Sequence, residues 1–291
     1  MARSFCVVGA DGLIGAALRQ ALKDRGLACV ATTRRPERAA GDMRLLDLAD
    51  ERAVSAFSAE AGVAFLCAAI TNMLACERDP EGTKKVNVTA AVTIARRLWD
   101  AGAHVVLLST NVAFDGSKPF PQPTSPVAPA NEYGRQKAQA EAAIAALGNR
   151  FTIVRMTKVL GPNLPLIRGW CENLRKGNPI RPFADIFIAP LSLPYVVRAL
   201  LRVGEHRQEG ILHLSGERDL SYAEFATLIA ARLGARAGLV RPTNSAEAGV
   251  VLPPSPRSTA LGSCEPEREL GLYAQSGSEV ARELVDALNA A

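Results

Sequence analysis

A tyrosine and a lysine stand four residues apart in the segment "EYGRQKAQAE", residues 132–141. Good helix formers surround them, and residues at i and i+4 project from one helix face, so Tyr133 and Lys137 are expected side by side. A phenol can donate a proton to a carbonyl oxygen, although free tyrosine titrates at about pH 10. A lysine ammonium nearby favours the phenolate and lowers that pKa. The pair is therefore a candidate proton donor, but packing and a solvated surface charge would explain most isolated pairs of this kind.

A hydroxyl that orients the carbonyl would complete such a site. The segment "VVLLSTN", residues 105–111, is an apolar run typical of a buried strand, and it includes Ser109 and Thr110 near its end. We expect both hydroxyls at the carboxyl end of this strand, just before the proline-rich loop that leads to the helix of Tyr133.

Three glycines near the start of the chain have the spacing of a phosphate-binding turn. In "VVGADGLIGAAL", Gly9, Gly12 and Gly15 follow a strand-like run and open a helix-like one. Glycines there let the backbone approach a phosphate closely, and the helix N-terminus supplies free N–H groups and partial positive charge. This strand–turn–helix context predicts a dinucleotide cofactor.

The end of the second strand indicates which dinucleotide fits. An acidic residue there would bind the ribose 2′-hydroxyl of NAD, whereas arginine accommodates the 2′-phosphate of NADP. The strand ends in Thr33, Arg34 and Arg35, with no carboxylate before Glu37, so NADP(H) is favoured over NAD(H). Asp47 falls where an acidic side chain reaches the adenine amino group, or else it caps the following helix.

These residues need a scaffold, and up to residue 110 short apolar runs alternate with helical stretches. Strands are expected at 5–10, 27–33, 63–70 and 103–110, with helices at 13–26, about 50–61 and 83–102. The alternation predicts an α/β fold with a doubly wound parallel Rossmann sheet. The dinucleotide-binding domain would span 1–160 plus about 185–208. A smaller C-terminal substrate-binding lobe would take 161–184 and 209–291, and would meet the sheet over the carboxyl ends of its strands.

The composition narrows the class of protein. The 291 residues carry a formal net charge of +5 without a block of like charges, which argues against a nucleic-acid partner. No apolar run reaches the roughly 20 residues that span a bilayer, and the chain opens on a strand rather than a signal segment. The six cysteines lack metal-binding or disulfide spacing, and His104, His206 and His213 lack metal-ligand spacing. These features predict a cytoplasmic protein in a reducing compartment, with a small-molecule substrate and no metal.

Taken in order, the motifs resemble those of the extended short-chain dehydrogenase/reductase family. They are G-x-x-G-x-x-G at 9–15, "LCAAI" at 66–70, Ser109-Thr110 and Tyr133-x-x-x-Lys137. The resemblance covers essentially the whole chain and is most specific for the branch typified by dTDP-4-dehydrorhamnose reductase. "LSTNVAFDG" resembles that branch's S-T-D-Y-V-F-x-G stretch, "EYGRQKAQAE" its N-x-Y-G-x-T-K-x-x-G-E helix, and "FTIVRMTKVLGPN" its R-T-S-W-V-Y-G strand.

This resemblance implies roles for individual residues. Thr110, Tyr133 and Lys137 would form the catalytic triad, with Tyr133 as proton donor and Lys137 also binding the nicotinamide ribose. Besides the residues already named, cofactor contacts are expected from Leu13, Ile14, Leu48, Cys67, Ala68, Ala69 and Ser109. Substrate contacts are expected from Thr71, Asn111, Val112, Lys158 and Arg181. The family also suggests a homodimer through the helices near 84–100 and 135–147.

Three departures from the family pattern lie where substrate would sit. Asn111 replaces an aspartate, Val112 replaces a tyrosine that contacts the sugar, and Lys158 replaces a tryptophan. The resemblance therefore implies retained chemistry on a changed substrate, with Lys158 either pairing with a phosphate or carboxylate or reaching solvent. We expect NADPH-dependent reduction of a keto sugar, a nucleotide-linked 4-keto-deoxysugar. An NAD-dependent nucleotide-sugar epimerase and a non-catalytic NADP-binding regulatory subunit remain as alternatives.

Overall fold

The structure, a computed structural model, describes residues 4–250, 258–263 and 265–289. The chain forms two compact units. The first comprises Met1–Phe114, Pro126–Arg155 and Val197–Leu212, and the second comprises Asp115–Ser125, Met156–Val196 and His213–Ala291. The loop at 115–125 groups with the second unit, whereas the predicted boundary at 160 kept it in the first.

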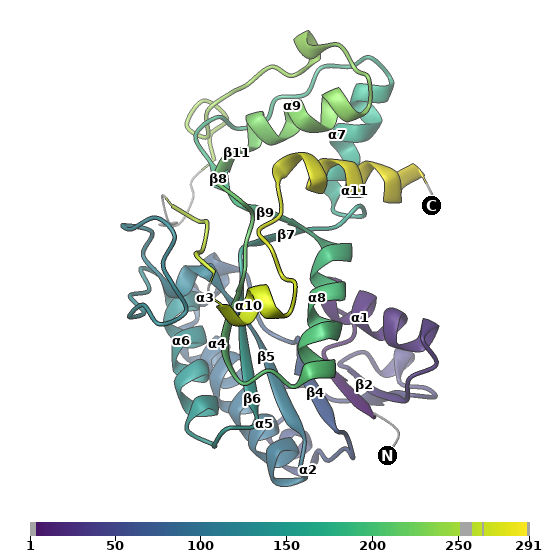
Figure 1. Ribbon diagram of the computed structural model, residues 1–291, viewed down its shortest axis with the longest axis vertical. Helices are drawn as coiled ribbons and strands as arrows, with labels where there is room; N and C mark the ends of the chain where they lie inside the picture. The colour runs from purple at the N-terminus through teal and green to yellow at the C-terminus, as the bar shows by residue number, and fades with distance from the viewer. Residues whose placement is uncertain (1–3, 251–257, 264, 290–291) are drawn as a thin grey trace. The chain divides into compact units, whose positions relative to one another are not determined.

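The first unit is built around a seven-stranded sheet in the order β10-β6-β5-β4-β1-β2-β3 (Figure 1). The strands are β1 (Phe5–Val8), β2 (Cys29–Thr33), β3 (Met43–Leu45), β4 (Val63–Leu66), β5 (His104–Thr110), β6 (Phe151–Met156) and β10 (Gly210–Leu214). β1 pairs in parallel with β2 and β4, β2 with β3, and β4 with β5. The predicted parallel Rossmann sheet is thereby confirmed. Since the strand order reverses between β1 and β4, their carboxyl ends form the switch point where open α/β sheets bind ligands.

Helices cover both faces of this sheet, as a doubly wound fold requires. They are α1 (Leu13–Asp24), α2 (Glu51–Ala56), α3 (Met73–Arg78), α5 (Ala91–Asp100), α6 (Glu132–Ala145) and α8 (Leu193–His206). On one face, Cys6 joins Ile94 of α5 and Ile144 of α6 in a single apolar cluster. On the other face, Gly204 of α8 lies against Phe65, because a Cβ at Gly204 would come within 2.7 Å of that ring.

The long helix predicted at 83–102 is interrupted by a π-helical segment. α4 (Pro80–Lys84) leads into this segment, η2 (Lys85–Ala90), and α5 follows it. Asn87 within η2 is buried; its side chain accepts a hydrogen bond from Ile70 N at 2.7 Å and donates one to Gln136 at 2.9 Å. π-helical turns are short and often lie at functional sites. The apolar periodicity of the segment did not reveal the interruption, since it depends on these distant partners.

Most predicted elements differ by one or two residues at their ends, but one helix and one strand end well before the predicted residue. The helix expected at about 50–61 is α2, which ends where Phe57 turns to an extended conformation. The strand expected at 63–70 is β4, which ends at Leu66. In the first case the apolar pattern runs on because the loop after α2 also contributes to the core cluster.

The segment at 151–161 holds two strands that belong to different sheets. β6 runs in the main sheet, whereas β7 (Lys158–Leu160) pairs with β9. Thr157 separates them: its N–H donates to Leu214 O at 3.1 Å, and its hydroxyl accepts a hydrogen bond from Gly216 N at 3.2 Å.

The second unit has its own apolar core, which includes Ile167, Phe225 and Leu284. Its helices and short strands are α7 (Pro165–Arg175), β8 (Phe187–Ile188), β9 (Pro190–Ser192), β11 (Leu220–Ser221), α9 (Tyr222–Arg232), η4 (Ala237–Leu239), α10 (Glu265–Glu269) and α11 (Gly277–Asn289), besides β7. Ser221 and Glu224 form a reciprocal capping box that starts α9. Of the helices the structure describes, none combines the length and apolar character needed to cross a bilayer.

Candidate active site

The turn between β1 and α1 has a backbone that only glycine permits at two positions. Gly9 has φ +89°, and a Cβ there would lie 2.6 Å from the Cβ of Ala68. A Cβ on Gly15 would lie 2.3 Å from Gly9 O. Gly12 is the N-cap of α1 and brings no side chain to cap it, so the first N–H groups of the helix are open to an anion. These residues fit the pyrophosphate of a dinucleotide cofactor.

The other predicted cofactor residues lie at the carboxyl ends of neighbouring strands. Leu13 and Ile14 form the first turn of α1, Asp47 and Leu48 follow β3, and Cys67, Ala68 and Ala69 follow β4. Asp47 is exposed, and its carboxylate accepts a hydrogen bond from Ala49 N at 2.9 Å. Asp50 is the residue that caps α2, through two N–H groups of the first turn. The alternative role of Asp47 as a helix cap is therefore excluded.

The end of β2 carries the residues expected to select the cofactor. Thr33 is buried, whereas Arg34 and Arg35 are exposed. Within the part of the chain that the structure describes, the Arg34 guanidinium has no hydrogen bond or ion pair. The Thr33 hydroxyl accepts a hydrogen bond from Arg35 N at 3.0 Å and donates one to the carboxylate of Asp11. Asp11, which no motif singled out, thus brings a negative charge to a strand end where the sequence showed only arginines.

The first turn of α6 approaches the end of β5 closely. Asn131 is the N-cap of α6 and accepts a hydrogen bond from Gly134 N at 2.8 Å. A Cβ on Gly134 would lie 2.2 Å from Val112 O, so no larger residue fits this approach. Because Tyr133 precedes Gly134 and Thr110 lies two residues before Val112, two residues of the predicted triad come from adjoining segments.

Thr110 is the last residue of β5 and caps the short helix η3 (Asn111–Ala113). Its hydroxyl oxygen accepts a hydrogen bond from Val112 N at 3.2 Å and lies 3.5 Å from Asn111 Oδ1. Val112 is buried, Asn111 is half-buried, and Thr71 in the loop after β4 is exposed. Of the three predicted substrate residues Thr71, Asn111 and Val112, Val112 therefore presents the least surface to a ligand.

Lys137 is buried and reaches the same strand. Its Nζ donates a hydrogen bond to Leu108 O at 2.7 Å. Burial lowers the pKa of Lys137 to about 8, against the opposing effect of the Glu141 carboxylate one turn further along α6. Glu141 is also buried; it accepts a hydrogen bond from the Ser109 hydroxyl and pairs with Arg155 Nη2 at 2.7 Å. Ser109, predicted to contact the cofactor, thus directs its hydroxyl to Glu141.

The expected lowering of the Tyr133 pKa is wrong for this structure. Burial raises the pKa of the Tyr133 phenol well above its ordinary value, and Cys76 adds to the rise. Lys137 does not offset this, since its ammonium is directed at the Leu108 carbonyl and is itself destabilised by burial. At neutral pH the phenol is therefore protonated, which is the form that donates a proton.

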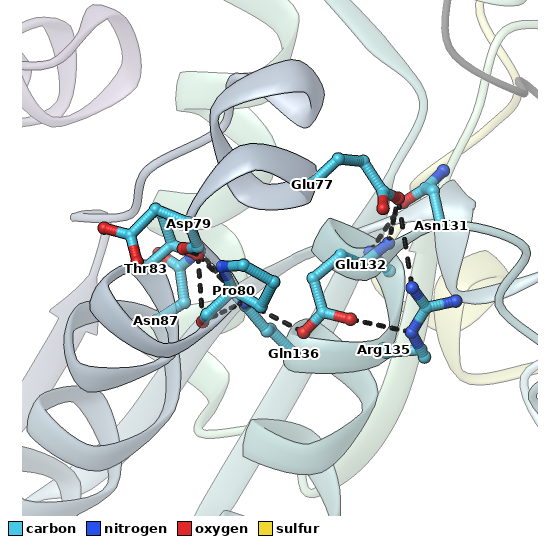
Figure 2. A network of polar contacts seen from close by, with 10 residues as sticks. Glu77, Asp79, Pro80, Thr83, Asn87, Asn131, Glu132, Arg135 and Gln136 are labelled. Atoms are coloured by element: carbon cyan, nitrogen blue, oxygen red, sulfur yellow. Dashed lines mark hydrogen bonds and ion pairs between the residues drawn. The ribbon is translucent and has the colours of Figure 1, made fainter.

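A polar network holds the helical turn that carries the tyrosine–lysine pair (Figure 2). Gln136 is completely buried; its amide nitrogen donates to Pro80 O at 3.1 Å and to Thr83 Oγ1 at 2.9 Å. Its oxygen accepts a hydrogen bond from Asn87, which also bonds Ile70 in the loop after β4, next to the predicted cofactor residues. The network therefore links α6 to α4, to the π-helical segment and to the loop after β4.

Two predicted substrate residues belong to the second unit. Lys158 opens β7 and is exposed. Arg181 is also exposed, and its Nη2 donates to Thr243 Oγ1 at 3.4 Å. Neither cation forms an ion pair with a residue that the structure describes. Their contact with substrate stays a prediction.

The histidines and cysteines are possible metal ligands or disulfide partners. His213 is a buried residue of β10, and burial lowers the pKa of His104 to about 4. Five cysteines carry free thiols, and the sixth, Cys264, lies outside the described residues. Among residues 4–250, 258–263 and 265–289, no three His, Cys, Asp or Glu side chains gather as metal ligands would.

Known proteins resemble the chain over nearly its whole length. The family described as "RmlD substrate binding domain" matches residues 3–288. The chain belongs to this family. A dTDP-4-keto-6-deoxy-D-glucose reductase of Streptomyces niveus is 29% identical, over 94% of this chain and 92% of that protein. The beta subunit of methionine adenosyltransferase 2 from Xenopus laevis is 24% identical, over 93% and 83%.

A solved structure shares the fold of the chain. The dTDP-4-dehydrorhamnose reductase of Bacillus anthracis, determined in complex with NADP, superposes with a TM-score of 0.84 at 20% identity and covers 99% of both chains. The family match and this fold confirm the predicted resemblance to the dTDP-4-dehydrorhamnose reductase branch.

Several residues that position the RmlD-family motifs were not predicted. They are Asp11, Gly134, Gln136, Glu141 and Arg155. Gly134 and Glu141 stand within the family's helix motif, so the motif held a signal for them. Asp11 had none, because its partner Thr33 lies 22 positions away in the chain.

Proposed function

We propose that this protein uses NADPH to reduce the keto group of a nucleotide-linked sugar, a 4-keto-deoxysugar. The observation that carries the proposal is the placement of α6. Tyr133 directly precedes Gly134, whose backbone closely approaches Val112, and the Lys137 ammonium of the same helix donates to Leu108 O of β5, the strand that ends at Thr110. The named reductases among the relatives support the same reaction class.

Each residue of the triad has a distinct part in the reduction. NADPH, when bound at the glycine turn, supplies the hydride. Thr110 orients the carbonyl oxygen through its hydroxyl, and Tyr133 donates its phenolic proton to that oxygen as charge develops on it. Lys137, whose ammonium donates to the Leu108 carbonyl of β5, holds the nicotinamide ribose, the role that the family resemblance implies for it.

The exposed arginines support NADPH as the cofactor. Arg34 and Arg35 follow the last residue of β2, where a 2′-phosphate would need cationic partners. They argue against the NAD-dependent epimerase that shares this chemistry. The free thiols suit a reducing compartment, and the proposal therefore places the reaction in the cytoplasm.

A second candidate function is a non-catalytic NADP-binding regulatory subunit. The Xenopus relative is named as a subunit. Asn111 and Val112, which replace an aspartate and a tyrosine of the family pattern, alter the segment next to the triad.

Tyr133→Phe separates the two functions. We expect wild-type protein to oxidise NADPH when given dTDP-linked 4-keto-6-deoxysugars. The decrease in absorbance of the reduced nicotinamide measures this oxidation. The variant should lose about 10²–10⁴-fold in turnover while its NADPH affinity, measured by calorimetry, stays unchanged. NADPH binding without turnover on dTDP-, UDP- or GDP-linked keto sugars would favour the subunit, and preference for NADH would favour the epimerase.

A further inference from the structure

One carboxylate joins the glycine turn to the turn after β2. Asp11 Oδ1 accepts a hydrogen bond from Arg38 Nη1 at 3.2 Å, and Oδ2 accepts one from the Thr33 hydroxyl. The Asp11 side chain is 15% exposed and that of Arg38 is 53% exposed. Arg38 ends the short helix η1 (Pro36–Arg38). Both oxygens of Asp11 are thus engaged by the segment that carries the exposed arginines.

Asp11 is ionised in this setting. Burial acts to raise the pKa of its carboxyl, but hydrogen bonds from Thr33 and Arg38 and the charges of Arg35 and Arg38 hold that pKa below its ordinary value. A negative charge therefore lies at the end of β2 at neutral pH. Arg38 forms an ion pair with it directly, whereas Arg35 acts on it only through space.

A carboxylate at this strand end favours NAD and disfavours NADP. It accepts a hydrogen bond from a ribose 2′-hydroxyl, and it repels a 2′-phosphate. The arginines predict the opposite preference. A preference for NADP is compatible with this carboxylate only if a cation balances its charge and its oxygens already accept hydrogen bonds from the protein.

We propose that Arg38, by holding the carboxylate of Asp11, sets the preference of this site for NADPH. The inference rests on the proposed function, since it takes the glycine turn and the end of β2 as the adenosine side of the cofactor site. Arg38 acts here as a positioning residue. Without it, Asp11 Oδ1 is free to accept a ribose hydroxyl and its charge is unopposed, so the preference moves toward NADH.

Calorimetric dissociation constants for NADPH and NADH test this in wild type, Arg38→Ala, Asp11→Asn and the double variant. Arg38→Ala should weaken NADPH binding by about tenfold, because the Asp11 carboxylate that it leaves unopposed repels the 2′-phosphate. NADH should bind this variant as well as, or better than, the wild type. Adding Asp11→Asn to Arg38→Ala should restore NADPH affinity by about tenfold, because the unopposed charge is removed.

Two matched controls make the rescue specific. Glu37→Gln removes an exposed carboxylate of the same turn that has no ion pair with any described residue, and it should not rescue Arg38→Ala. Arg34→Ala should weaken NADPH binding equally with and without Asp11→Asn. If Asp11→Asn lowers the melting temperature, Asp11→Ser replaces it in the rescue experiment, since serine also lacks the negative charge.

The outcomes separate this inference from the proposed function. If wild type binds neither cofactor, both are overturned. If wild type prefers NADPH but Arg38→Ala weakens both cofactors alike, or Asp11→Asn fails to rescue it, Arg38 is a plain phosphate contact and this inference alone is overturned.

Discussion

Two charged regions of the first unit differ in how they are held. At the turn after β2, the ion pair of Arg38 with Asp11 is 53% and 15% exposed, and Arg34 extends without a described partner. On the buried side of α6, the ion pair of Arg155 with Glu141 is 3% and 5% exposed, and Glu141 also accepts a hydrogen bond from the Ser109 hydroxyl. Exposed pairs contribute little to stability, whereas a buried pair that loses one partner is costly. The difference implies that substitutions at the turn after β2 leave the fold intact, whereas substitutions of the buried charges behind α6 destabilise it.

The largest effect on stability is expected from Glu141→Ala. It removes the buried carboxylate that pairs with Arg155 and opposes the effect of burial on the Lys137 ammonium, and the free energy of unfolding should fall by about 3–5 kcal/mol. Chemical denaturation of the apoprotein measures this. The surface pair of Glu205 with Arg25, 32% and 48% exposed, provides the control: Glu205→Ala should cost less than about 1 kcal/mol. Equal costs for the two variants would remove the contrast between the regions.

Gly134→Ala should destabilise the protein although alanine ordinarily favours a helix. Its Cβ would lie 2.2 Å from Val112 O, a backbone atom of the turn after β5. The free energy of unfolding should fall by about 1–3 kcal/mol, and turnover should fall with it as α6 moves away from Thr110.

Gly169 in α7 is the matched control for Gly134, since a Cβ there meets nothing within 4 Å. Gly169→Ala should raise the melting temperature, with a gain of up to about 1 kcal/mol. A Gly134→Ala variant that is equally stabilised and fully active would show that α6 tolerates a looser approach to β5.

The pH dependence of Lys137 gives opposite trends for activity and stability. Its folded pKa of about 8 lies below the ordinary value of 10.5, so turnover that needs the ammonium should fall as pH rises through about 8. Between the two values the unfolded chain binds more protons than the folded one, so the Lys137 contribution to the free energy of unfolding rises with pH. Turnover of the wild type, and chemical denaturation of wild type and Lys137→Met, across pH 7–11 measure the two trends. If the free energy of unfolding of the wild type, relative to that of Lys137→Met, falls as pH rises, the lowered pKa of Lys137 is contradicted.

The smallest effect on stability is expected from Arg34→Ala. The free energy of unfolding should stay within about 0.5 kcal/mol of wild type, as for other exposed positions. NADPH affinity should drop by about tenfold through loss of a charge-assisted contact, while NADH affinity is unchanged. A matching loss of NADH affinity would mean that Arg34 supports the turn rather than the 2′-phosphate.

Much of the fold was predictable because its signals are local. A strand followed by Gly9, Gly12 and Gly15 needs only neighbouring residues to be recognised, and the alternation of apolar runs and amphipathic stretches predicted the parallel sheet. The end of that pattern at Thr157 was not visible. At Thr157 the chain passes from one sheet to another, and the hydrogen bonds that fix this residue come from Leu214 and Gly216, which are distant in the sequence.

The sequence by itself determined which residues we propose to carry chemistry: the glycine turn, the arginines after β2, and Tyr133 with Lys137 on one helix face. Tertiary structure decided their electrostatic setting. It brought Asp11 to Thr33 across 22 positions, and it desolvated the Tyr133 phenol so that its pKa rises rather than falls. The physical reason is that spacing along a helix or strand depends on the local chain, whereas the charge state of a side chain depends on burial and on neighbours that only folding brings together.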